Sequence, residues 1–418
     1  APYSGMRKQD EYNERVRASD MFLALFHKKA GKFTIEEFNI ARKAFDEQAS
    51  PKIYTYIKDL EAGESESREL AEFKRLMLEE LGHYWCRYSN FDTMQLHFVL
   101  QLQMVEATTP IKVEVKESQV KIGDSTIADL NNVPFTSENA THRELQSRKE
   151  QLDREIGNAE SGGRRGFFGQ RSRMTDEELA NLREERESVT EQIERQEKAL
   201  VDTAMSIARM QGGECSPRMR TAAELFEKGE TDKAEAVLKE DDMEADATNA
   251  KLKFDTAAQP TAELARNIER CAGEYMLKAR IVVSGIADES RYRQAVKLMS
   301  TAIDLVSGRL PEETLAEYLF DYAVLLADAG QQTKALETWE RLSGIYERLY
   351  RKAPQKYAYG YAGVLNNMAV LYSDKGDFDH CLSKYLKAID IYDWLDREEP
   401  GIYDDDIARL KNNLGTLY

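Results

Sequence analysis

A constant step of 46 residues between similar segments is the feature of this sequence that most restricts its fold. The segment LFDYAVLLADAG begins at residue 319, LNNMAVLYSDKG begins at residue 365, and Gly330 and Gly376 end these two copies. A third, partial copy, KNNLGTLY, closes the sequence. Repeats of this length are typical of helical pairs that stack on one another. The sequence therefore predicts an all-α solenoid over residues 213–418.

The glycines of this region predict where its helices end. The first helix of each pair should stop at its glycine, because glycine adopts the left-handed conformation that ends many helices. A shorter unit, RTAAELFEKGETDKAEAVLKE (220–240), has the same layout of helix, Gly229 and helix. Each repeat buries its apolar face only against its neighbours. Because the sequence stops inside a repeat, and also starts without Met, we expect further residues at both ends.

The composition excludes several classes of protein. The 418 residues carry a formal net charge of −17, and phosphate binding needs a basic face, so we expect no nucleic-acid partner. No apolar run reaches the ~18 residues of a membrane span, and the first residues lack the apolar core of a signal peptide. The four cysteines are far apart and form no CxxC pair, which favours reduced thiols in a cytoplasmic protein. No histidine spacing suggests a metal site.

Two apolar runs near the start predict an α/β domain. SDMFLALF (19–26) and PKIYTYI (51–57) have the composition of buried strands. Between them, Thr34 is a candidate helix cap with Glu37 three residues later, as in a capping box. A helix here would bury Phe38 on its apolar face. A strand, a helix and a strand within about 40 residues form a parallel β–α–β unit.

The middle of the chain changes its pattern twice. Residues 111–135 alternate between apolar and polar side chains and contain a Gly-Asp turn, so they predict a β-hairpin. Residues 141–211 carry two leucine-rich stripes and predict an antiparallel helical hairpin of coiled-coil type. Its loop is rich in glycine and arginine, and is either a solvated tip or a contact for an anionic partner. The expected domains are 1–108 (α/β), 109–138 (β-hairpin linker), 139–212 (helical hairpin) and 213–418 (solenoid).

The repeats resemble the tetratricopeptide family, in the long-helix form of kinesin light chains. The residues that carry the resemblance are LNNMAVLYSDKGDFDHCLSKYLKAIDIY (365–392) and their partial copies over about 217–240 and 258–418. The resemblance implies a scaffold that binds a protein or peptide partner. It says nothing about which partner.

Residues 1–105 resemble a divergent bacterial TIR domain, which has a flavodoxin-like α/β fold. SDMFLALF matches the third strand of that family, and PKIYTYIKD matches the fourth. GKFTIEEF (31–38) matches the start of the intervening helix, with Phe33 and Thr34 in the places of a tryptophan and a cysteine. Glu37 stands in the place of the catalytic glutamate. The family's first two strands and the loop between them have no counterpart here.

The TIR resemblance implies that the protein cleaves NAD+ at the bond between nicotinamide and ribose. NAD+ would be the substrate, with no separate cofactor, and Glu37 would be the catalytic residue. The resemblance implies that NAD+ lies near Phe33 and Phe26, with Lys28, Lys29 and Lys32 beside the pyrophosphate. Helix physics alone offers a simpler interpretation, in which Glu36 and Glu37 only stabilise the start of a helix.

Three functions are compatible with these features. In the first, the chain is a prokaryotic anti-phage effector: the repeats sense a partner or phage product, the TIR-like domains form a homo-oligomer, and NAD+ is cleaved. In the second, the chain is a non-enzymatic scaffold for assembly. A third, weaker possibility is a sensor of cyclic nucleotides, which rests on fold analogy alone.

Overall fold

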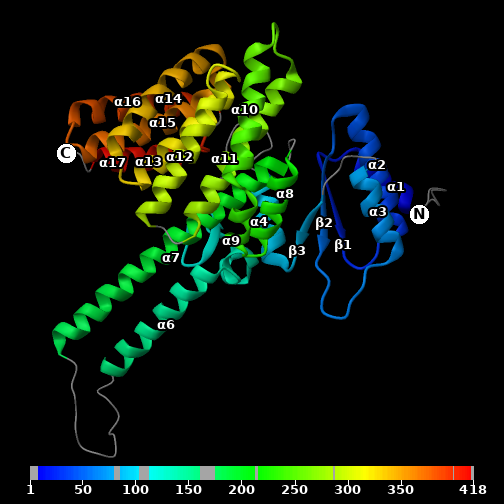
Figure 1. Ribbon diagram of the computed structural model, residues 1–418, viewed down its shortest axis with the longest axis horizontal. Coiled ribbons are helices and arrows are strands. Elements are labelled where there is room, and N and C mark those ends of the chain that lie inside the picture. Colours follow the sequence, from blue (N-terminus) through cyan, green and yellow to red (C-terminus); the bar gives the residue numbers. More distant parts are fainter. Residues whose placement is uncertain are drawn as a thin grey trace, which may run out of the picture. The chain divides into compact units, whose positions relative to one another are not determined.

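The computed structural model describes residues 8–79, 85–102, 113–160, 175–211, 215–285, 288–398 and 400–415. Helices dominate this part of the chain (Figure 1), in agreement with the expected helical solenoid. The chain forms two compact units. Unit 1 comprises Ala1–Phe98 with Ile127–Val133, and unit 2 comprises Val99–Thr126 with Pro134–Tyr418.

Unit 1 contains a three-stranded parallel sheet with the strand order β1-β2-β3. The expected β–α–β unit is confirmed, because β1 and β2 pair in parallel on either side of α2 in the chain. The third strand was not expected, since it has only three residues. The elements are α1 (Lys8–Arg17), β1 (Met21–Phe26), α2 (Lys32–Gln48), β2 (Lys52–Lys58), α3 (Arg68–Glu79), β3 (Cys86–Tyr88), α4 (Phe91–Leu102) and the short helix η1 (Leu130–Asn132).

Helices α2 and α3 cover one face of this sheet. Phe26 of β1, Phe38 of α2 and Phe73 of α3 are buried together, and the Phe38 and Phe73 rings meet edge to face at 5.1 Å. On the opposite face, Tyr54 of β2 packs against Phe98 of α4 at 5.5 Å. Apolar burial and ring contacts of this kind dominate the stability of a small core.

One face of β1 is open. Met21, Leu23 and Leu25 are 45%, 39% and 46% exposed, because α4 packs against the tyrosines of β2 and not against this stripe. The prediction that SDMFLALF is a buried strand is therefore wrong for this face. The other face, which carries Ala24 and Phe26, is buried as expected.

The predicted hairpin region forms a small three-stranded sheet whose first two strands pair antiparallel. The first turn lies at Glu117 and Ser118, which both have positive φ. The expected Gly-Asp turn at Gly123 joins the second strand to a third strand that was not expected. The strands are β4 (Glu114–Lys116), β5 (Gln119–Ile122) and β6 (Ser125–Asp129), of which β6 belongs to unit 1 from Ile127 onward.

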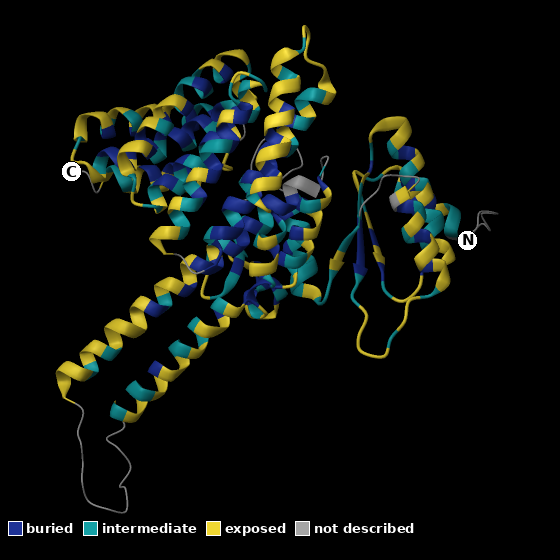
Figure 2. Cartoon of the chain, in the orientation of Figure 1, coloured by how far each residue is buried: buried dark blue, intermediate teal, exposed yellow. Residues whose placement is uncertain are grey.

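The predicted helical hairpin is present as α6 (Ala140–Glu160) and α7 (Asp176–Gln211), which pack against each other. Leu152, Val189 and Ile193 form its buried seam, and most of its outer surface is exposed (Figure 2). At its base, His142 and Glu197 form a buried pair at 2.9 Å. The loop arginines Arg164, Arg165, Arg171 and Arg173 lie outside the described residues.

The rest of unit 2 is a series of helices, and from α10 onward each packs against the next along the chain. Gly330 and Gly376 follow α13 and α15 with φ of 70° and 73°, as predicted, and Gly229 follows α8 with φ of 78°. The elements are α5 (Pro134–Ser137), α8 (Pro217–Glu227), α9 (Thr231–Val237), α10 (Glu240–Thr256), α11 (Ala262–Val283), α12 (Glu289–Val306), α13 (Glu312–Asp328), α14 (Gln332–Lys352), α15 (Pro354–Asp374), α16 (Phe378–Glu398) and α17 (Asp404–Gly415).

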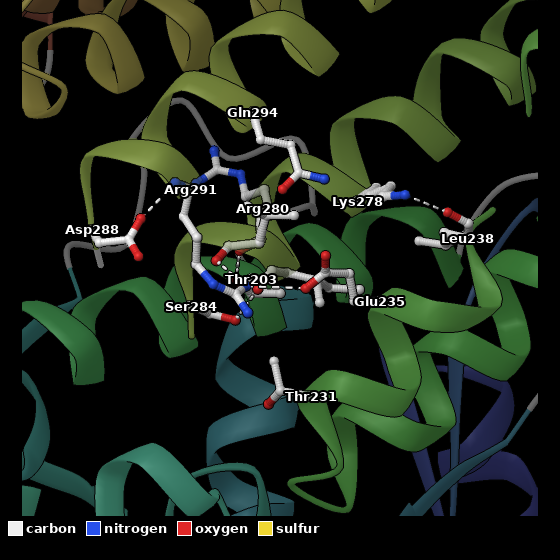
Figure 3. A network of polar contacts seen from close by, with 12 residues as sticks. Thr203, Thr231, Glu235, Leu238, Lys278, Arg280, Ser284, Asp288, Arg291 and Gln294 are labelled. Atoms are coloured by element: carbon white, nitrogen blue, oxygen red, sulfur yellow. Dashed lines mark hydrogen bonds and ion pairs between the residues drawn. The ribbon is translucent and has the colours of Figure 1, made fainter. Parts of the chain in front are cut away.

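Charged side chains join α9 and the loop after it to α11 and α12 (Figure 3). Nη1 of Arg291 donates to the Glu235 carboxylate and to the Val282 carbonyl, both at 3.0 Å. Nζ of the buried Lys278 donates to the Leu238 carbonyl at 2.8 Å. These bonds satisfy carbonyl groups at helix ends, which would be costly to bury without a partner.

None of the described helices combines the length and the apolar composition that crossing a membrane requires.

Candidate active site around Glu37

Glu37 lies near the carboxyl ends of the parallel strands. Strand β1 ends at Phe26, a loop of five residues follows, and α2 begins at Lys32. Open parallel sheets bind ligands at this edge, beside the loops that leave the strands. Glu37 is half-buried in the second turn of α2.

The start of α2 differs from the prediction. The N-cap is Gly31, without a side-chain cap, and the first turn contains no acidic residue. Thr34 lies inside the helix, so the prediction of a capping box formed by Thr34 and Glu37 is wrong. Carboxylates stabilise mainly the first helical turn, and Glu37 comes after it. The simpler interpretation of Glu37 as a helix-start residue therefore loses its main support.

Two amides of α1 hold the adjacent carboxylates of α2. Nε2 of Gln9 donates to Oε1 of Glu37 at 2.8 Å. Nδ2 of Asn13 donates to Oε1 of Glu36 at 2.9 Å, and Nε2 of Gln9 also reaches Oδ1 of Asn13 at 3.2 Å. The four side chains form one network between the two helices, and its donors are neutral.

The three lysines of the loop region do not behave alike. Lys28 forms an ion pair with Glu64. The Glu64 carboxylate accepts hydrogen bonds from Lys28 and from the backbone N–H of Glu61, and these bonds lower the pKa of Glu64. Lys29 and Lys32 are exposed. Of the three, these two have the side chains most available to a ligand.

The two aromatic residues of the expected site also differ. Phe33 is 56% exposed at the start of α2 and can stack on a planar ligand. Phe26 is 3% exposed and packs against Phe73 at a centroid distance of 5.3 Å. Its ring belongs to the core, so it offers no open face to NAD+.

This arrangement can stabilise positive charge on a bound ligand. Oε1 of Glu37 accepts the hydrogen bond from Gln9, and its other carboxylate oxygen can accept hydrogen bonds from hydroxyl groups of a ligand. The partly buried setting strengthens electrostatic interactions relative to bulk water. Within the described residues, no group of three or more His, Cys, Asp or Glu side chains could hold a metal ion.

A second charged site lies in unit 2, where a cavity of about 200 Å³ is lined by α7, α11, α12 and α13. Nη2 of Arg280 pairs with Asp321 at 2.7 Å. Burial alone would lower the pKa of Arg280, but Asp321, Asp202 and Asp328 together raise it. Burial raises the pKa of Asp202 and of Asp328. Sequence spacing could not have revealed this site, because its charges come from three separate helices.

We compared the chain with known proteins. A scan against protein-family models, a search of curated proteins and a search of solved structures all found no match.

Proposed function

We propose that this protein cleaves NAD+ between nicotinamide and ribose, with Glu37 as the catalytic residue, when several copies are brought together. The observation that carries the proposal is the 2.8 Å hydrogen bond from Gln9 to Glu37 near the carboxyl edge of the sheet. A neutral donor fixes the carboxylate and leaves its charge in place. That charge stabilises the cation that develops on the ribose.

The chemistry needs little else from the protein. The bond between the ribose carbon and the nicotinamide nitrogen breaks, and its electron pair goes to the nitrogen, which neutralises the positive nicotinamide. No general acid is needed for this leaving group. The ribose passes through an oxocarbenium-like state, as in glycoside hydrolysis. Water then adds to the ribose carbon and loses a proton, which gives ADP-ribose.

The residues around Glu37 would contribute to different extents to binding NAD+. Lys29 and Lys32 would contact the pyrophosphate, since both are exposed. Phe33 would stack on a ring of the substrate. Lys28 would contribute less, because Glu64 already pairs with it, and the buried Phe26 would support the core.

The proposed biological role is that of an anti-phage effector in the bacterial cytoplasm. Unit 1 would be a TIR-like domain, and the helical pairs of unit 2 would be tetratricopeptide repeats that recognise a protein partner or phage product. Stacked helical pairs present an extended surface to which a partner can bind. The engaged copies would form a homo-oligomer in which NAD+ is cleaved.

Nicotinamide release measured by chromatography tests the proposal. The full-length protein is incubated with NAD+ at high concentration in a crowding agent, and assembly is confirmed by light scattering. The assembled wild type should release nicotinamide, and the assembled Glu37→Gln variant should not. The variant Glu47→Gln is the control, because Glu47 lies exposed on the same helix and should be dispensable. An assembled wild type without turnover would rule out the enzyme.

The second candidate is a scaffold without enzymatic activity. The open apolar stripe of Met21, Leu23 and Leu25 favours it, since exposed apolar patches often mark surfaces of association. In that case, unit 1 would only self-associate and the helical pairs would recruit another effector. Assembly without nicotinamide release in the same experiment would support this candidate.

A further inference from the structure

We infer that Gln9 is the positioning residue for Glu37, and that Glu36 sets the orientation of Gln9 through Asn13. The inference rests on the proposed function and adds helix α1 to the site. Gln9 and Asn13 are 28 and 23 residues away from the glutamates that they contact. No residue pattern around Glu37 indicates them.

The hydrogen bonds of the network fix the orientation of both amides. An ionised carboxylate only accepts hydrogen bonds, so the atom of Asn13 that faces Glu36 must be Nδ2. Oδ1 of Asn13 then faces the other way and accepts from Gln9 at 3.2 Å. The atom of Gln9 that contacts both Asn13 and Glu37 must therefore be Nε2. Each amide has a single orientation that satisfies all three contacts.

Spacing along the two helices explains why this network can form. Gln9 and Asn13 are four residues apart and share one face of α1. Glu36 and Glu37 are adjacent, with side chains about 100° apart around α2, and each meets one amide. Asn13 is only 6% exposed. A buried amide that loses its partner is costly, so burial holds this end of the network in place.

The consequence for Glu37 is a carboxylate in a defined orientation before the substrate arrives. Gln9 occupies Oε1, and Oε2 is left for the ribose. Holding a catalytic group in its reactive orientation lowers the barrier and affects ground-state binding less. Loss of Gln9 should therefore reduce kcat and leave KM nearly unchanged.

Two variants of the full-length protein test this role by kinetics. Gln9→Ala should lower kcat about tenfold to a hundredfold with KM within about twofold. Gln9→Glu has nearly the same size but adds a second carboxylate beside Glu37, so its kcat should be lower still. The control is Glu11→Gln, which changes an exposed ion pair with Arg15 on the same helix and should leave both constants unchanged. A Gln9→Ala variant with unchanged kcat, or with only KM raised, would overturn the inference.

Nuclear magnetic resonance provides a readout that does not need turnover. With ¹⁵N-labelled glutamine, the side-chain amide signal of Gln9 is assigned by its loss in Gln9→Ala, or in Gln9→Glu if that variant folds better. The inference predicts that Glu37→Gln and Glu36→Gln both shift this signal, the second through Asn13. If the Gln9 signal shifts in neither variant, the inference is overturned. If the wild type lacks activity, the proposed function fails and this measurement alone decides whether Gln9 positions Glu37.

Discussion

The helical pairs of unit 2 and the sheet of unit 1 depend on different kinds of contact. The same helix ending recurs at Gly229, Gly330 and Gly376, each time with positive φ and with backbone bonds to the preceding turn. In unit 1, strand β1 pairs with β2 about 31 residues further along the chain. Repeated local contacts make unit 2 tolerant of single changes, whereas unit 1 depends on a few long-range contacts.

The largest expected effect concerns the core of unit 1. Phe38→Ala removes a fully buried ring that packs against Phe73 and should destabilise unit 1 by about 3–5 kcal/mol. Urea unfolding followed by circular dichroism should show an earlier transition for unit 1 than in the wild type. The control is Leu252→Ala in unit 2, where the side chain is 61% exposed and loss should be nearly neutral. Equal effects of the two variants would show that the Phe38 ring does not stabilise the core of unit 1.

The glycines that follow helices α8 and α13 of unit 2, Gly229 and Gly330, provide a test with a smaller expected effect. Gly330→Ala places a Cβ in open space, so it should cost about 1–2 kcal/mol, the penalty of the left-handed conformation. At Gly229 a Cβ would lie 2.7 Å from the carbonyl oxygen of Pro134, and overpacking should add about 1–3 kcal/mol. The free energy of unfolding of both variants checks this order. A Gly330→Ala variant that is the less stable of the two would show that crowding does not govern these positions.

The smallest expected effect is a pH dependence in the charged site of unit 2. Burial raises the pKa of Asp202, so the folded state binds more protons than the unfolded state between the unfolded and the folded pKa. The contribution of Asp202 to stability therefore falls as pH rises through this window. Asp202→Asn should remove that part of the dependence, as measured by urea midpoints from pH 4 to pH 7. Identical pH profiles would contradict a raised pKa.

The sequence predicted most elements whose signals are local. The glycine endings at Gly330 and Gly376 follow from backbone sterics, and the leucine stripes of α6 and α7 follow from helical periodicity. Strand β3 was missed because its three residues carry too short a pattern, and it forms by pairing with the end of β2. The sequence predicted the start of α2 near Thr34, because threonine is a good N-cap residue. In the structure the helix begins at Lys32.

The candidate site was only partly predictable. Glu37 was singled out by the family resemblance alone, and the structure adds that Phe33 and Lys32 are exposed. The burial of Phe26 depends on its packing against Phe73 of α3, which the local sequence does not encode. The contact with Gln9 likewise depends on how α1 packs against α2.

The most direct test of the account compares two neighbouring carboxylates. The turnover of NAD+ by assembled Glu36→Gln and Glu37→Gln proteins is measured under identical conditions, with folding confirmed by circular dichroism. The account predicts a loss of about a thousandfold or more for Glu37→Gln and a loss of about a hundredfold or less for Glu36→Gln, which reaches Glu37 through the amides. Equal losses in the two variants, or a Glu37→Gln protein that retains wild-type turnover, would contradict the assignment of Glu37 as the catalytic residue.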